Sequence, residues 1–219
     1  GVPSPYNTIA MPNGPCQNQE YLDLVDVPPH GVARWKDTLS TFSKQVTYRS
    51  PGRLILKSPT HTCRIPTLLE LFPEARFVHI VRHPIAVFQS TMHLWRSLYL
   101  TQAFQHPRFE HLQEQVLTRF LHMHYRLQQT RDLVPAGHFI DLKYEQLVAD
   151  IPGTIEQLYD SLRLGTFEDV RPTIEDYAAA KSDFQTNRYN ISPELTQLIT
   201  ERWRPYFEAY GYELEGLTA

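Results

Sequence analysis

The stretch LILKSPTHTCRIPTLLELFPEARFVHIVRHPIAVFQS, which runs from Leu54 to Ser90, decides the fold. Residues 53–57 and 76–81 are short apolar runs, and each predicts a strand covered on both faces because its apolar residues are continuous rather than alternating. Between them, apolar side chains recur on one helical face until Pro73 stops the helix; they are Ile65, Leu68, Leu69 and Phe72. The stretch therefore predicts a strand, a helix and a second, parallel strand.

The flanking sequence continues this alternation. Helices are expected at 30–48, 84–100 and 109–131, and a third strand at 139–143. The remainder is expected to be helical, ending in a helix that Ser192 caps and that Pro205 kinks or breaks. Alternating strands and helices predict an α/β layered fold with a central parallel sheet and a helical C-terminal part.

Composition excludes several classes of protein. The 219 residues are 42% hydrophobic and 21% charged, which is enough apolar material for one core, so a single domain over 1–219 is expected. A net charge of −3 without a basic stripe argues against a nucleic-acid-binding protein. No apolar run approaches the roughly 20 residues that cross a bilayer, so no transmembrane segment is expected. Cys16 and Cys63 lack metal-ligand spacing, and a reducing, cytoplasmic location is favoured.

Polar residues follow each predicted strand, at the edge where ligands collect in a parallel sheet. Lys57 ends the first strand, Arg82 follows the second, and Tyr144 follows the third. Ser90 lies eight residues after Arg82, about two turns into the next helix. A guanidinium, a helix N-terminus and a hydroxyl could bind one phosphate there. The alternative is that Arg82 pairs with a surface carboxylate and Ser90 only fills a helix position.

The residues from Leu54 to Ser90 resemble the central block of sulfotransferases that use 3′-phosphoadenosine 5′-phosphosulfate. The similarity includes the Lys-Ser-Pro loop, the Phe-Pro-x-Ala-Arg-Phe-Val phrase, the Arg-x-Pro turn and the serine eight residues after that arginine. The later sequence Lys143-Tyr144-Glu145-Gln146-Leu147 is similar to the family's Tyr-Glu-Asp-Leu element, with Gln146 in place of Asp. The resemblance implies a P-loop-NTPase-like three-layer fold and transfer of a sulfuryl group to a hydroxyl or amine acceptor.

The resemblance also implies roles for individual residues. Arg82 and Ser90 match residues that bind the 3′-phosphate, and Tyr144 matches a tyrosine near the adenine. Lys57 matches the lysine that contacts the sulfuryl group, where a cation stabilises the charge that builds on the leaving phosphate. Arg188 is a candidate second cation for the 3′-phosphate, although the family's Arg-Lys-Gly triplet is absent here.

His61 is a candidate general base, because transfer to a hydroxyl or amine releases a proton. Familiar cytosolic members carry their catalytic histidine two residues after the lysine, where this chain has Pro59. A structural histidine bonded to its own loop is the alternative interpretation.

One family element has no match in this chain. The Gly-containing loop Pro-Lys/Arg-Ser-Gly-Thr-Thr, which holds the 5′-phosphosulfate through backbone amides, is absent, and the chain opens on Gly1 within a proline-rich stretch. We therefore expect the C-terminal portion of a longer domain, with weak activity alone and either self-association or a complementing N-terminal segment.

Two other functions are consistent with this architecture. A nucleotide or nucleoside kinase is disfavoured because no Gly-x-x-x-x-Gly-Lys-Ser/Thr loop or clear Mg²⁺-holding carboxylate follows a strand, so a metal-independent reaction is expected. A non-catalytic nucleotide-binding scaffold is the other alternative, and the missing loop is the argument for it.

Overall fold

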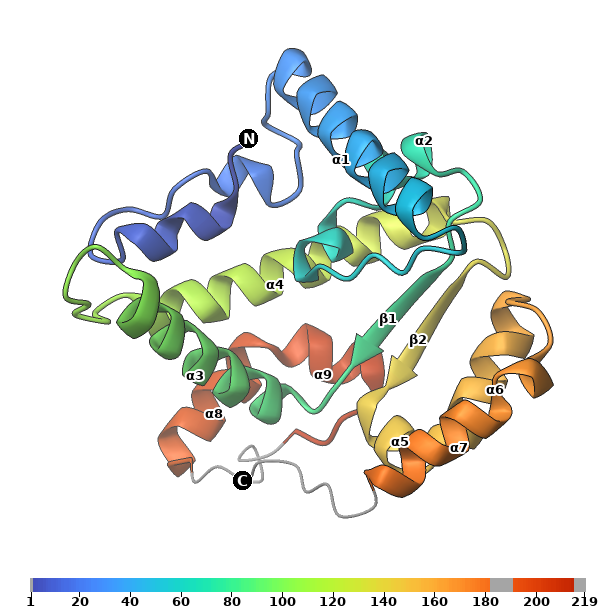
Figure 1. The fold of residues 1–219 in the computed structure, drawn as a ribbon. Coiled ribbons are helices and arrows are strands. Elements are labelled where there is room, and N and C mark those ends of the chain that lie inside the picture. Colours follow the sequence, from blue (N-terminus) through green and yellow to red (C-terminus); the bar gives the residue numbers. More distant parts are fainter. Residues whose placement is uncertain (1, 182–190, 215–219) are drawn as a thin grey trace. The chain divides into compact units, whose positions relative to one another are not determined.

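The computed structural model describes residues 2–181 and 191–214, and it is a mixed α/β structure in which helices predominate. Its strands are β1 (Phe77–Val81) and β2 (Phe139–Lys143), which pair in parallel as neighbouring arrows in Figure 1. Over the same ranges, no helix is long and apolar enough to cross a membrane. The predicted combination of helices with a parallel sheet is confirmed at this level.

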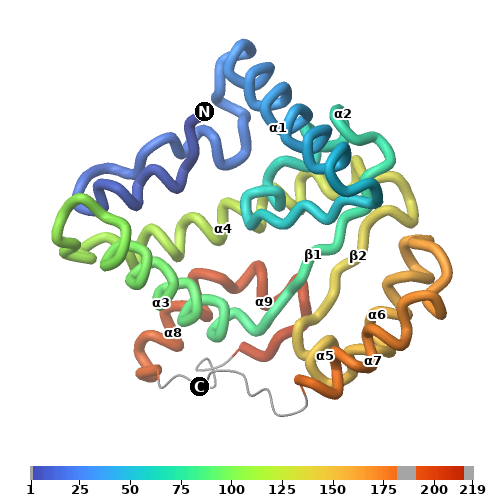
Figure 2. The backbone as a smooth tube through the Cα atoms, viewed as in Figure 1, coloured from blue at the N-terminus to red at the C-terminus, as the bar shows by residue number. Residues whose placement is uncertain are grey.

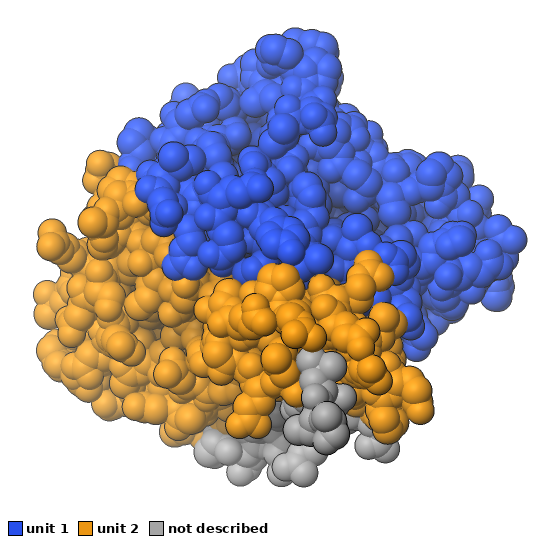
Figure 3. Space-filling model, turned by 180° about the vertical axis from the view of Figure 1, so that it is seen from behind, with its two compact units in different colours: residues 1–73, 91–133 blue, residues 74–90, 134–219 orange. Residues whose placement is uncertain are grey.

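The chain divides into two compact units, which Figure 3 colours separately. Unit 1 comprises residues 1–73 and 91–133, and unit 2 comprises residues 74–90 and 134–219. Both strands therefore belong to unit 2.

In unit 2 the two strands run in register from Phe77 opposite Phe139 to Val81 opposite Lys143. Successive side chains point to opposite faces of the sheet. On one face Leu142 packs into an apolar cluster with α6 (Ile151–Leu162), whose Leu162 is 1% exposed. On the other face His79 bonds its register partner Asp141, with 2.8 Å between Nδ1 and Oδ1, and its ring lies 5.8 Å from that of Tyr210. Tyr210 ends α9 (Arg204–Tyr210), so helices contact both faces of the sheet.

The other helices of unit 2 include two whose ends are set by a cap and by a proline. The short helix α5 (Tyr144–Ala149) follows β2 directly, and α7 (Arg171–Ala180) packs against α6. The hydroxyl of Ser192 accepts a bond from the Leu195 N–H and caps α8 (Pro193–Arg202). The predicted break at Pro205 is confirmed, because α8 ends at Arg202 and α9 begins at Arg204.

Unit 1 is helical, and Figure 2 follows its path through α1 (Pro29–Arg49), α2 (Ile65–Leu71) and α4 (Leu112–Thr130). The 3-10 helix η3 (Pro59–Cys63) packs against α4. Helix α4 starts three residues later than predicted because Phe109 has a φ of 62°, which is outside the helical region. Helix α3 (Pro84–Gln102) begins in unit 2 and continues into unit 1.

The prediction of a strand at 53–57 is wrong in this structure. These residues are not part of a sheet, their exposure alternates along the segment, and Ile55 is 92% exposed. An extended segment becomes a strand only when a neighbour supplies the ladder of hydrogen bonds. In the described residues β1 pairs with β2, and neither pairs with this segment.

Candidate functional site

The ends of β1 and β2 bring Arg82 and Tyr144 together in unit 2. Val81 and Lys143 are register partners, so the residues that follow them leave the sheet side by side. The guanidinium carbon of Arg82 lies 4.4 Å from the centre of the Tyr144 ring. A guanidinium stacked on an aromatic face keeps its N–H donors at its rim, in the plane that suits bidentate recognition of phosphate. This arrangement is compatible with binding an anion.

Ser90 lies on α3, which starts at Pro84 directly after the Arg82-His83 turn. The helix places Ser90 about two turns from its N-terminus, as the sequence predicted. Ile85 and Phe88, which are 7% and 2% exposed, bury the opposite side of these first turns. The ring of Phe88 packs edge-on against Trp203 at 5.8 Å, which anchors the helix that carries Ser90.

Polar side chains of the same unit form hydrogen bonds with the backbone between β1 and α3. The hydroxyl of Tyr206 lies 3.3 Å from the Arg82 nitrogen and 3.4 Å from the Arg82 oxygen. One carboxylate oxygen of Glu145 accepts the His83 N–H at 2.9 Å, and the other accepts the Tyr212 hydroxyl at 3.0 Å. The sequence interpretation assigned no role to any of these three side chains. Glu145 lies in the Tyr144-Glu145-Gln146-Leu147 element that resembles the family, and the two tyrosines lie in an aromatic-rich C-terminal segment.

Lys57 and His61 belong to unit 1, where they flank the start of η3. Lys57 is exposed at the end of the 53–57 segment. Ser58 and Thr60 bond each other through their hydroxyls at 3.0 Å, and Thr60 is 5% exposed, so the turn after Lys57 is fixed by local contacts. The His61 N–H donates to the Ser58 carbonyl at 3.0 Å.

His61 is half-buried, and its Nδ1 has no hydrogen-bond partner within the part of the chain that the structure describes. Burial, and then the charge of Arg64, lower its pKa to about 4. Arg64 is itself 7% exposed; its guanidinium lies 4.9 Å from the Trp35 ring centre and donates to the Tyr21 carbonyl. The imidazole is therefore neutral at neutral pH, which is the form that accepts a proton.

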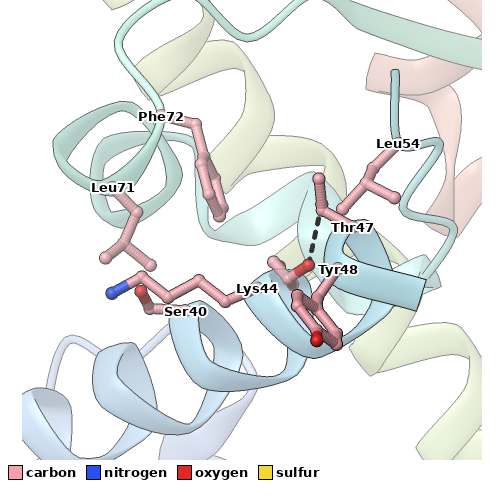
Figure 4. Close-up of a pocket in the computed structure, with 8 residues that line it drawn as sticks. Ser40, Lys44, Thr47, Tyr48, Leu54, Leu71 and Phe72 are labelled. Carbon is pink, nitrogen blue, oxygen red and sulfur yellow. Dashed lines mark hydrogen bonds between the residues drawn. The ribbon is translucent and has the colours of Figure 1, made fainter. Parts of the chain in front are cut away.

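A groove of about 530 Å³ lies in the same unit (Figure 4). Its lining residues come from α1, α2 and the segment after each; they are Ser40, Ser43, Lys44, Thr47, Tyr48, Leu54, Leu71 and Phe72. Ser43 and Thr47 donate their hydroxyls to carbonyls of their own helix at 2.9 Å. The groove shares no residue with the predicted site, although Leu54 is three residues from Lys57 along the chain.

Arg188 lies in 182–190, outside the described residues. Within the described residues, no group of three or more His, Cys, Asp or Glu side chains is arranged to hold a metal ion.

Comparison with known proteins identifies the family. The sequence model described as "Sulfotransferase family" matches residues 19–169. Omega-hydroxy-beta-dihydromenaquinone-9 sulfotransferase Stf3 of Mycobacterium bovis, and the protein of the same name in Mycobacterium tuberculosis, are each 42% identical over 213 residues. That match covers 97% of this chain and 55% of each relative, so the chain spans about half the length of these relatives. No solved structure matches significantly. On the family match, which covers more than half of its residues, the chain belongs to the sulfotransferase family.

Proposed function

We propose that this chain carries the nucleotide-binding part of an enzyme that transfers a sulfuryl group from 3′-phosphoadenosine 5′-phosphosulfate to a small-molecule acceptor. The observation that carries the proposal is the Arg82 guanidinium stacked on Tyr144 at the paired ends of β1 and β2. Such a group, in a chain of this family, suits the phosphate that distinguishes this donor from ordinary adenine nucleotides.

The donor is bound in this proposal through its 3′-phosphate. Arg82 supplies a fork of N–H donors, the N-terminus of α3 supplies a favourable dipole, and Ser90 supplies a hydroxyl. Tyr144 contacts the adenine, and Arg188 adds a second cation to the phosphate. The stacking of Arg82 on Tyr144 supports this assignment, because it holds the guanidinium before the ligand arrives.

The reaction breaks a sulfur–oxygen bond of the donor and forms a new bond between sulfur and the acceptor atom. The acceptor oxygen or nitrogen forms a bond to sulfur while the bond from sulfur to the bridging oxygen breaks, and the electron pair stays on the leaving phosphate. Lys57 stabilises the negative charge that grows there, and His61 takes the proton from the acceptor. Burial lowers the pKa of His61 and leaves its imidazole unprotonated at neutral pH, so it can take up a proton, but as a weaker base than an exposed histidine.

We extend the proposal to finer properties of the protein. Both units belong to one sulfotransferase domain with a P-loop-NTPase-like three-layer fold, and the reaction needs no metal. The protein is cytoplasmic, and it associates with itself or with a complementing segment. A hydroxyl is the favoured acceptor group, since the Mycobacterium relatives are named for an omega-hydroxy compound.

Replacing Arg82 by Ala should weaken binding of 3′-phosphoadenosine 5′-phosphate by about tenfold to a hundredfold, because a charge-assisted hydrogen bond contributes about 1.5 to 3 kcal/mol. Titration calorimetry measures the loss. Arg108→Ala is the matched control, since its side chain is 62% exposed and belongs to unit 1. Wild-type affinity in Arg82→Ala would remove this residue from the nucleotide site.

Replacing Lys57 by Ala should lower kcat by about a hundredfold and change donor binding little, because the ammonium meets charge that develops only in the transition state. Steady-state kinetics of sulfuryl transfer separates the two effects. Lys44→Ala, another exposed lysine of unit 1, serves as the control. A tenfold rise in KM at unchanged kcat would make Lys57 an ordinary binding residue.

The depressed pKa of His61 makes a prediction about stability. Above about pH 6.5 the imidazole is neutral in both the folded and the unfolded chain; between pH 6.5 and about 4 the unfolded chain binds the proton more readily, which favours unfolding. Wild-type protein should therefore lose more unfolding free energy than His61→Gln as the pH falls through this window. Denaturant titrations at a series of pH values measure it, with His30→Gln as an exposed control. Identical pH profiles of unfolding free energy for wild type and His61→Gln would show that the pKa of His61 is not lowered in the folded protein.

A further inference from the structure

The turn that carries Arg82 is held by a polar network that is separate from the residues proposed to bind the nucleotide. Tyr206 on α9 is 4% exposed, and its hydroxyl accepts the Arg82 N–H at 3.3 Å and donates to the Arg82 carbonyl at 3.4 Å. β1 ends at Val81, so these backbone groups lie just beyond the sheet. One phenol thus bridges both polar backbone groups of the anion-binding residue.

Glu145 holds the next residue along the chain. Its carboxylate accepts the His83 N–H at 2.9 Å and the Tyr212 hydroxyl at 3.0 Å. The Tyr212 ring lies edge-on to the His83 ring at 5.3 Å and parallel to the Tyr206 ring, with 6.4 Å between centroids and 5° between planes. Tyr206, Tyr212 and Glu145 therefore form one connected clamp, which grips residues 82 and 83 in succession.

The hydrogen bonds of this clamp require that both tyrosine hydroxyls are protonated at neutral pH. Burial raises the pKa of Tyr206 above the ordinary value of a phenol. Burial, together with the hydrogen bond to Glu145, does the same for Tyr212. Both hydroxyls therefore keep their protons and can donate, Tyr206 to the Arg82 carbonyl and Tyr212 to the carboxylate.

We infer that Tyr206, Glu145 and Tyr212 are positioning residues that hold the Arg82 guanidinium in the orientation that binds the 3′-phosphate; the inference rests on the proposed function. The direction of a side chain depends on the φ and ψ of its own residue, and the clamp fixes the backbone on both sides of the Arg82 Cα atom. Glu145 also follows Tyr144 directly, so its hydrogen bonds hold the chain next to the residue on which the guanidinium stacks. A cation fixed before binding loses less conformational entropy when the anion arrives.

The test compares two nucleotides that differ by one phosphate. Dissociation constants are measured by titration calorimetry for 3′-phosphoadenosine 5′-phosphate and for adenosine 5′-phosphate. The Kd of adenosine 5′-phosphate divided by the Kd of 3′-phosphoadenosine 5′-phosphate isolates the contribution of the 3′-phosphate. Tyr206→Phe keeps the buried ring and removes only the hydroxyl. We expect it to lower the ratio about fivefold to tenfold, with affinity for adenosine 5′-phosphate unchanged.

Two substitutions at Glu145 separate positioning from loss of structure. Glu145→Ala removes both hydrogen bonds and should lower the ratio at least as far as Tyr206→Phe. Glu145→Gln should restore most of the ratio, because its carbonyl oxygen can accept the His83 N–H and its amide can donate to the Tyr212 oxygen. Tyr159→Phe, which removes a hydroxyl from α6, is the matched control and should leave the ratio at its wild-type value. Circular dichroism verifies that each variant is folded.

The outcomes distinguish this inference from the proposed function. An unchanged ratio in both Tyr206→Phe and Glu145→Ala overturns the clamp while Arg82 keeps its role. Equal losses of affinity for both nucleotides also overturn it, because they indicate general destabilisation. A wild-type ratio near one, or a ratio that Arg82→Ala leaves unchanged, contradicts the proposed function itself and the clamp with it. Should Tyr206→Phe fail to fold, the same ratio of dissociation constants is measured in Glu145→Ala, Glu145→Gln and Tyr212→Phe. An unchanged ratio in both Glu145→Ala and Tyr212→Phe then overturns the clamp.

Discussion

The parallel pairing of β1 with β2 is the constraint on which the candidate nucleotide site depends. Its register sets Val81 opposite Lys143. Arg82 follows Val81 and Tyr144 follows Lys143, so these two residues leave the sheet next to each other. The 4.4 Å contact between their side chains is a direct result of that register. A slip of one residue would send every side chain of a strand to the other face and separate the pair. The chemistry proposed for Arg82 thus depends on the hydrogen-bond ladder of a short sheet.

Apolar packing of the C-terminal helices secures the same edge of the sheet. Trp203 and Phe207 are fully buried, and Trp203 packs against Phe88 on the first turns of α3. The helix that carries Ser90 and the helix that carries Tyr206 are therefore joined through one core. This packing explains how residues distant along the chain can fix the turn at 82 and 83, since a close-packed interior does not permit small independent shifts.

The sequence predicted the elements of the sheet better than their neighbours. Strand β2 has the predicted bounds and β1 begins one residue later than predicted, because both are short, mainly apolar runs that end at a cationic residue or just before one. The same reasoning failed at 53–57, since composition indicates a preference for extended structure and says nothing of which strand lies alongside. Arg82, Ser90 and Tyr144 were found as candidates because each follows a predicted strand or lies in the helix after one. The clamp was missed because Tyr206 is 124 residues from Arg82 in sequence, and such a contact leaves no local pattern.

The most direct measurement is a crystal structure of this chain with 3′-phosphoadenosine 5′-phosphate. Our account predicts that oxygens of the 3′-phosphate lie within about 3 Å of the Arg82 guanidinium nitrogens. It also predicts that the Ser90 hydroxyl contacts the same phosphate and that the guanidinium remains stacked on Tyr144. A 3′-phosphate bound away from Arg82, with the nucleotide held by other residues, would contradict it.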